Sequence, residues 1–292
     1  MRKYLVDFMQ ECEYAEEDIN ALINAYETLC NCDESRKVLE RIILEYESDY
    51  TLNFEPIFEL FPKMAEVSGV NLYTVAFVCF LTLTRRMRKA YAERGIDDSI
   101  FLASALDLRY KLAECKRAKG VAGTFAITWY PRFFNLTRFA LGRLQFEAKP
   151  IEEEYNGPSG HLPVGSTVLG VHIPNDGTPL TTESVRSSFE MAAEFYGDKF
   201  GLKPIFICRS WLLWPKHEEL LKPSSNILAF MHEFEILKTG IYEGEHSLFT
   251  IFGTDETRPE YLEATTSLQR VYKELLARGE PCGWGYGIKF LK

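Results

Sequence analysis

Hydrophobic residues in the first part of the chain recur at the spacing of one buried helix face. In residues 19–30 and again in 38–46, apolar side chains follow the i, i+3, i+4, i+7 pattern. Pro62 should kink or shorten a further helix that is expected to begin near residue 55. The pattern predicts about five helices, and helix throughout, over residues 1–119.

Two polar residues mark where further helices of this region should begin. Asn71 can cap a helix that runs towards Gly95, and Asp97 or Asp98 can cap the next one. The basic cluster 85–89 lies at the end of the first of these helices. Cations suit the C-terminal end of a helix dipole, so we favour a structural role for this cluster.

After Gly120 the pattern changes to strands joined by helices. We expect strands over 123–130, 138–147, 168–173, 204–213, 235–241, 247–253 and 284–291, with a hairpin turn at 242–246. We expect helices over 183–200, 227–234 and 260–278, and an exposed connection over 148–166. This alternation predicts a mixed sheet with helices packed on it, and an α+β fold for the whole chain.

Composition narrows the class of protein. The 292 residues are 46% hydrophobic and 14% aromatic, which supplies core material and argues against disorder. The net charge of −9 argues against a nucleic-acid partner, because phosphate neutralisation needs clustered cations. The seven cysteines are scattered, and Cys30 and Cys32 have no nearby histidines, so no metal site is expected.

The N-terminus and the apolar runs predict where the protein resides. Residues 1–4 lead into an acidic amphipathic pattern rather than a signal peptide. The longest apolar run, at 75–83, is too short to cross a bilayer. We therefore expect a cytoplasmic protein with reduced thiols and no membrane partner, while the oligomeric state is not indicated.

The junction between strand 168–173 and helix 183–200 is a candidate ligand site. The strand ends at Pro174, and a loop rich in polar and glycine residues leads into the helix. The first N–H groups of a helix lack partners within it, and they can receive a phosphate-bearing ligand. Four loop residues are the candidates for this contact: Asn175, Gly177, Thr181 and Thr182.

From residue 120 onward the order of elements resembles the GNAT superfamily of acyltransferases, which use acyl-coenzyme A. Strand 169–173 is similar to the family's splayed central strand, and strand 204–213 to its partner. The sequence Asn226-Ile227-Leu228-Ala229 resembles the N-x-x-A start of the helix beside the pantetheine arm. The resemblance implies acyl-CoA as co-substrate, held by loop 174–182 and by Asn226.

A closer resemblance is to a bacterial family of proposed acyltransferases. Four segments carry it: 139–147, 171–174, 208–213 and 225–227. The resemblance implies a helical N-terminal domain over 1–119 and a GNAT-like mixed α/β domain over 120–292.

His172 and Glu147 are the candidates for proton transfer. GNAT-type aminolysis needs a route for the ammonium proton, and histidine titrates near neutral pH. His172 would lie on the splayed strand, and Glu147 ends the preceding strand. The alternative for His172 is a histidine buried and hydrogen-bonded in the sheet.

Three further residues are candidates for substrate binding. Arg143 shares its side of a strand with Gln145 and Glu147, which predicts either a polar cleft or a solvated sheet face. Arg209 could pair with a carboxylate or phosphate of a ligand, or with the acidic surface. Trp129 could line a pocket or belong to the core. Cys208 and Ser210 lack the setting of a nucleophile, so a covalent acyl-enzyme is not expected.

The sequence as a whole favours an N-acyltransferase that moves an acyl group from acyl-CoA to an amine of a small molecule. Two departures from the superfamily pattern favour a different reading, a non-catalytic GNAT-fold protein that binds a small ligand or an acyl chain. The Arg/Gln-x-x-Gly-x-Gly/Ala loop is absent, and no tyrosine lies between Ala229 and Leu237. Both alternatives stay open at the level of the sequence.

Overall fold

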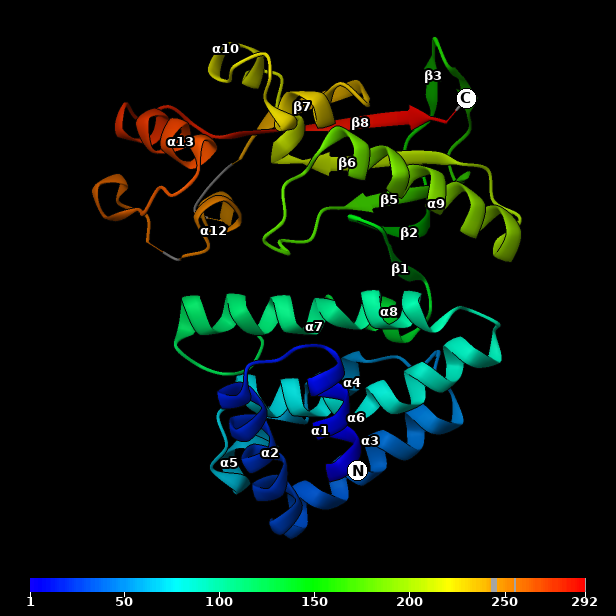
Figure 1. Ribbon diagram of the computed structural model, residues 1–292, viewed down its shortest axis with the longest axis vertical. Coiled ribbons are helices and arrows are strands. Elements are labelled where there is room, and N and C mark those ends of the chain that lie inside the picture. Colours follow the sequence, from blue (N-terminus) through cyan, green and yellow to red (C-terminus); the bar gives the residue numbers. More distant parts are fainter. Residues whose placement is uncertain (243–245, 255, 292) are drawn as a thin grey trace. The chain divides into compact units, whose positions relative to one another are not determined.

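The computed structural model describes residues 1–242, 246–254 and 256–291. The chain forms two compact units, Met1–Ala140 and Leu141–Lys292 (Figure 1). The first unit is helical and the second is built on a mixed sheet with helices, so the predicted α+β fold class is confirmed. Residues 120–140, which we expected to begin the second domain, are part of the first unit.

Short helices make the first unit richer in elements than the periodicity predicts. Its helices are α1 (Arg2–Glu11), α2 (Glu16–Asn31), α3 (Asp33–Ser48), α4 (Glu55–Phe58), α5 (Phe61–Ser68), α6 (Leu72–Glu93), α7 (Asp98–Lys119) and α8 (Pro131–Phe134). Seven of them precede Gly120, against about five predicted. Pro62 lies in the first turn of α5, where a missing N–H costs nothing, so it separates two helices rather than kinking one.

Helix α6 is the core of this unit. Its side chains at 74–84 are all buried, and the Asn71 side chain caps it by accepting from Tyr73 N. Phe80 packs against Tyr130 at 4.6 Å and Phe134 at 5.5 Å between ring centroids. A helix that is apolar on all sides must be surrounded, which is why the other helices enclose it.

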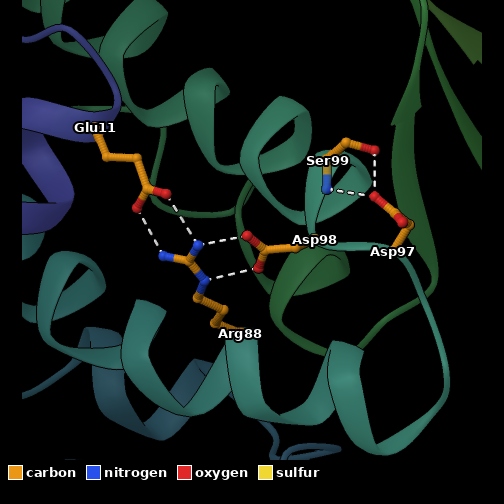
Figure 2. Close-up of polar contacts among 5 residues, drawn as sticks. All are labelled: Glu11, Arg88, Asp97, Asp98 and Ser99. Atoms are coloured by element: carbon orange, nitrogen blue, oxygen red, sulfur yellow. Dashed lines mark hydrogen bonds and ion pairs between the residues drawn. The ribbon is translucent and has the colours of Figure 1, made fainter.

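Arg88 links three helices of this unit (Figure 2). Its guanidinium donates to both carboxylate oxygens of Glu11 on α1, at 2.7 and 2.9 Å, and to Asp98 on α7. Hydrogen bonds to these two carboxylates are the main cause that raises the pKa of Arg88. Asp97 caps α7 by accepting from Ser99 N at 2.8 Å. The structural interpretation of the basic cluster therefore fits Arg88.

The strand predicted over 123–130 is absent, and bends and turns take its place. Gly123 lies against the backbone of Tyr73 so closely that a Cβ would approach its carbonyl oxygen to 2.6 Å. Thr124 N donates to Tyr73 O at 3.0 Å, and Thr74 Oγ1 donates to Ala122 O at 2.8 Å. The backbone of this segment is thus bonded to the start of α6 and cannot join a sheet.

Alone, none of the described helices is both long and apolar enough to cross a membrane. The stretch Glu55–Ser68 and helix α6 meet that criterion only together, across a bend of 117°.

The sheet has the strand order β1-β2-β5-β6-β8-β7, and its first strand spans the boundary between the two units while the others belong to the second. Its strands are β1 (Arg138–Leu141), β2 (Leu144–Pro150), β5 (Thr167–His172), β6 (Ile205–Ser210), β7 (Glu235–Ile241) and β8 (Gly283–Phe290). Strands β5 and β6 pair in parallel, whereas the pairs β2/β5, β6/β8 and β7/β8 are antiparallel. The single strand predicted over 138–147 is divided because Gly142 has φ +66°.

The two faces of this sheet are covered by different elements. Helix α9 (Thr182–Phe200) covers one face, where Phe189 lies 4.8 Å from Phe206 and 6.0 Å from Phe146 between ring centroids. A hairpin of β3 (Tyr155–Gly157) and β4 (Gly160–Leu162) packs on the other face, within the segment expected to be an exposed connection. The core of that face comprises Ile151, Tyr155, Val168, Ile205, Ile207 and Ile288.

The remaining elements follow β6 and β7. They are η1 (Trp211–Leu213), α10 (His217–Leu220), α11 (Asn226–Met231), α12 (His246–Phe252), η2 (Pro259–Tyr261) and α13 (Ser267–Ala277). The strand predicted over 247–253 is wrong, because this segment is helix α12 and β7 pairs with β8 instead. Leu248, Ile251 and Phe252 are buried at the i, i+3, i+4 spacing of a helix face. Of the predicted turn, residues 243–245 lie outside the described part of the chain.

Candidate active site

The two parallel strands at the centre of the sheet pair over a short length only. Their ladder comprises Leu169↔Phe206 and Gly170↔Ile207 and stops there. Beyond this point β5 continues to pair with β2 as far as His172, and β6 continues to pair with β8 as far as Ser210. The C-terminal ends of β5 and β6 therefore diverge, in agreement with the splay predicted for strand 169–173. Backbone groups that face each other there are available to a ligand.

His172 and Glu147 meet on one face of the sheet beside this opening. The antiparallel register places Gln145 opposite His172 and Glu147 opposite Gly170. His172 Nε2 lies 3.2 Å from Glu147 Oε2, and the two side chains are 26% and 13% exposed. A carboxylate in this position can orient the imidazole and stabilise its protonated form. The two residues predicted to transfer a proton are thus brought together.

The loop between β5 and α9 is held by Arg143. Its Nη1 donates to Pro174 O at 2.9 Å, its Nη2 donates to Thr178 O at 3.2 Å, and it pairs with Asp176 at 3.2 Å. The Arg143 side chain is only 10% exposed. We predicted a substrate contact for this residue, which stays a prediction, and these contacts show that Arg143 also holds the loop.

Ser188, which sequence reasoning missed, fastens the residue pair Gly142-Arg143 to helix α9. Its hydroxyl accepts from Arg143 N at 2.7 Å and donates to Ser184 O at 2.8 Å. A Cβ at Gly142 would lie 2.6 Å from Ser188 Oγ, so the turn needs glycine both for its positive φ and for this close approach. A Gly-Arg pair between two apolar runs was the available signal for this turn.

The loop presents the start of helix α9. Thr181 is the cap, accepting from Ser184 N at 3.2 Å, and Asp176 accepts from Thr178 N at 2.8 Å. Asn175, Gly177 and Thr181 are exposed, and Thr182 is the first residue of the helix. The positive end of a 19-residue helix and its first N–H groups are a favourable place for a phosphate group.

Arg209 and Asn226, two further candidates, come from different elements of the second unit. Arg209 is exposed at the end of β6, and its guanidinium carbon lies 4.1 Å from the centre of the Trp284 ring. Asn226 is exposed and begins α11, for which the Ser225 side chain is the cap. Trp129, the third predicted substrate contact, belongs to the helical unit, where its indole donates to the buried Asp107 at 2.9 Å.

Two other side chains of the second unit, Cys208 and Glu233, are poorly suited to act as a nucleophile or as a general acid. Burial raises the pKa of the Cys208 thiol to about 12, which keeps it protonated and argues against an acyl-enzyme. Glu233 stands near the position where the superfamily's tyrosine was expected, and it pairs with Arg186 and Lys289 at 2.8 Å each. Burial alone would raise its pKa, but these two hydrogen bonds outweigh burial and lower it. Within the described part of the chain, no group of three His, Cys, Asp or Glu side chains could hold a metal ion.

Fold and site together define a GNAT-like acyltransferase. The family model described as GNAT-like C-terminal domain matches residues 138–289, and the one described as N-acyltransferase N-terminal domain matches residues 3–136. The chain belongs to this family of two-domain N-acyltransferases.

Solved structures support the fold. The chain is similar to an acyltransferase in complex with decanoyl-CoA and teicoplanin, at 21% identity and a TM-score of 0.76, over 98% of this chain and 87% of that one. It is similar to an acyltransferase in complex with decanoyl-CoA, at 22% identity and a TM-score of 0.77, over the same shares. An acyltransferase mutant in complex with octanoyl-CoA matches at 23% identity and 0.76. By sequence, no curated protein gives a significant match.

Proposed function

We propose that this protein transfers an acyl group from acyl-CoA to an amine of a small molecule. The observation that carries the proposal is the His172–Glu147 pair beside the opening between β5 and β6. The amine nitrogen attacks the thioester carbonyl, the C–S bond breaks, and CoA leaves as a thiolate. His172 takes the proton that the amine loses, and Glu147 stabilises the resulting imidazolium.

The loop before α9 supports binding of the coenzyme. Asn175, Gly177, Thr181 and Thr182 are accessible around the start of the helix and suit the pyrophosphate. Arg143 and Asp176 hold the loop in one shape, so this chain uses an ion pair where the superfamily uses a glycine-rich sequence. Asn226 at the start of α11 would contact the pantetheine arm. The related structures contain octanoyl-CoA or decanoyl-CoA, which favours a medium-length acyl donor.

Calorimetric titration of the purified protein with CoA, acetyl-CoA and octanoyl-CoA tests the donor. We expect micromolar binding that is weakened about 10-fold or more in Asp176→Asn, because the loop loses the ion pair that shapes it. An absence of binding by the folded wild-type protein would contradict the proposal and favour the non-catalytic alternative.

Substitution of the paired residues tests the chemistry. We expect His172→Ala to lower kcat by about 10²- to 10⁴-fold, and Glu147→Gln by a smaller factor, with CoA affinity retained. The assay is the release of CoA thiol from octanoyl-CoA with a panel of primary amines as acceptors. Unchanged turnover in both variants would remove these two residues from the site.

A further inference from the structure

Arg209 and His172 occupy equivalent positions on the two diverging strands. The last residues that β5 and β6 pair are Gly170 and Ile207, and His172 and Arg209 each lie two residues further on. Side chains two residues apart along a strand share a face. The imidazole and the guanidinium therefore flank the opening from the same face of the sheet, one on each side.

The Arg209 guanidinium has no hydrogen-bonding partner among the residues that the structure describes. It differs in this respect from the other arginines of the second unit, which are bonded to a carboxylate or to backbone carbonyl oxygens. These are Arg143, Arg186, Arg258, Arg270 and Arg278. Among the described arginines of the second unit, Arg209 alone is accessible and lacks such a partner, although the chain as a whole carries a net charge of −9.

Trp284 holds that guanidinium in place. The arginine carbon lies 4.1 Å from the centre of the indole ring, a stacked cation–π contact. On the neighbouring strand Gly240 is directly opposite Trp284, and a Cβ at Gly240 would lie 2.6 Å from Cζ2 of the indole. The ring thus packs onto the bare backbone of β7 and offers a fixed support to Arg209.

We propose that Arg209 binds a carboxylate of the acceptor, so that the acceptor is an amino acid or another amine that also carries a carboxylate. A guanidinium held by stacking presents its planar donors to a carboxylate without losing further side-chain freedom. His172 would take the proton from the amine end of the same molecule. This inference rests on the proposed function and specifies the class of its acceptor.

The test compares acceptors that carry a carboxylate with their uncharged carboxamides. Octanoyl-CoA is the donor, and the acceptors are glycine, β-alanine, leucine and phenylalanine, each as the free acid and as the carboxamide. We expect Arg209→Gln to lower kcat/KM for the acids by roughly 10- to 150-fold, the range for a lost charged hydrogen bond, and to change it for the amides by less than about 2-fold. Comparing each acceptor with itself across variants cancels the different basicities of acid and amide.

Three variants sharpen the result. Arg209→Lys keeps the charge but loses the planar fork, so it should retain only part of the preference for acids. Gly240→Ala keeps Arg209 but displaces Trp284, and it should weaken the same preference. Arg278→Gln removes another exposed cation of the unit, whose side chain is 58% exposed, and should have no effect.

Two results would overturn the inference. Equal losses for acids and amides, with a raised KM for octanoyl-CoA, would mean that Arg209 contacts the donor. If the wild-type protein acylates none of the four free acids, amines that carry a carboxylate are excluded as its acceptors. Acylation of amides that depends on His172 would in that case leave the proposed function intact, whereas an absence of acyl-CoA binding would remove both proposals.

Discussion

The histidine His217 is buried in the second unit and differs in its surroundings from His172. Its side chain is fully buried, and its Nε2 lies 2.7 Å from the Tyr272 hydroxyl. Burial lowers its pKa from 6.5 to about 4, so the imidazole is neutral at pH 7. Two of the chain's five histidines, His172 and His217, therefore have opposite settings, one beside a carboxylate and one buried against a tyrosine hydroxyl.

This burial predicts a loss of stability in acid. Between pH 6.5 and about 4 the unfolded chain binds a proton at His217 that the folded protein excludes, so stability falls as the pH falls through this range. The loss reaches up to roughly 3 kcal/mol near pH 4. Urea unfolding followed by tryptophan fluorescence reports mainly on the second unit, which holds three of the four tryptophans, Trp211, Trp214 and Trp284, whereas Trp129 lies in the first unit.

The matched control for this prediction is His217→Gln, which keeps a polar group facing Tyr272 but does not titrate. It should show a smaller difference in unfolding free energy between pH 7.5 and pH 4.5 than the wild-type protein. An identical difference in both proteins would show that other groups, such as ion-paired carboxylates, cause the acid sensitivity.

At the scale of elements, the turn at Gly142 joins the sheet to helix α9 and thereby fixes the loop of the candidate site. We expect Gly142→Ala to destabilise the second unit by about 1–3 kcal/mol, because alanine is strained at φ +66° and its Cβ would overlap Ser188 Oγ. Denaturant unfolding measures the change. In a Ser188→Ala background the overlap is absent and part of the loss should be recovered. A variant as stable as the wild type would contradict the role given to this turn.

Elements could be predicted where the local signals are strong. The strand predicted over 168–173 and the helix predicted over 183–200 correspond to β5 and α9. Asn71 caps α6 as predicted, and Asp97, one of two predicted candidates, caps α7. The wrong predictions concern segments whose secondary structure depends on contacts with residues far away in the sequence. Residues 247–253 have an apolar content that suits a strand or a helix, and β7 pairs with the distant strand β8 rather than with them. Glu260 is followed by a loop, and α13 begins only at the Thr266 capping box.

The candidate site was predictable to a similar extent. His172 and Glu147 could be chosen from their chemistry and from their places on the strands predicted over 168–173 and 138–147, and the structure places them in contact. The role of Arg143 was not predictable, because its partners Pro174, Asp176 and Thr178 lie about thirty residues away on a loop without regular structure. Tertiary contacts of this kind leave no periodic signal in the sequence.

At the scale of the whole molecule, composition indicates that the chain can bury a large core, and the change in periodicity shows that its two parts are built differently. The position of the change is harder to infer. Residues 121–134 contain glycine, proline and aromatic residues that suit a strand and turn, but their backbone and rings are bonded to α6 and packed against Phe80. The helical unit therefore extends to Ala140.

Strand β8 has a practical consequence for anyone who wishes to alter this protein. Its alternate glycines Gly283, Gly285 and Gly287 leave no room for a side chain, because Trp214, the Leu213 backbone and Phe234 lie directly against them. On the other side the strand carries Trp284 and Tyr286, which are only partly buried. Only one face of β8 can therefore be varied by design. A combinatorial library at positions 284 and 286 would diversify the face that carries Arg209, while the three glycines stay constant in every member.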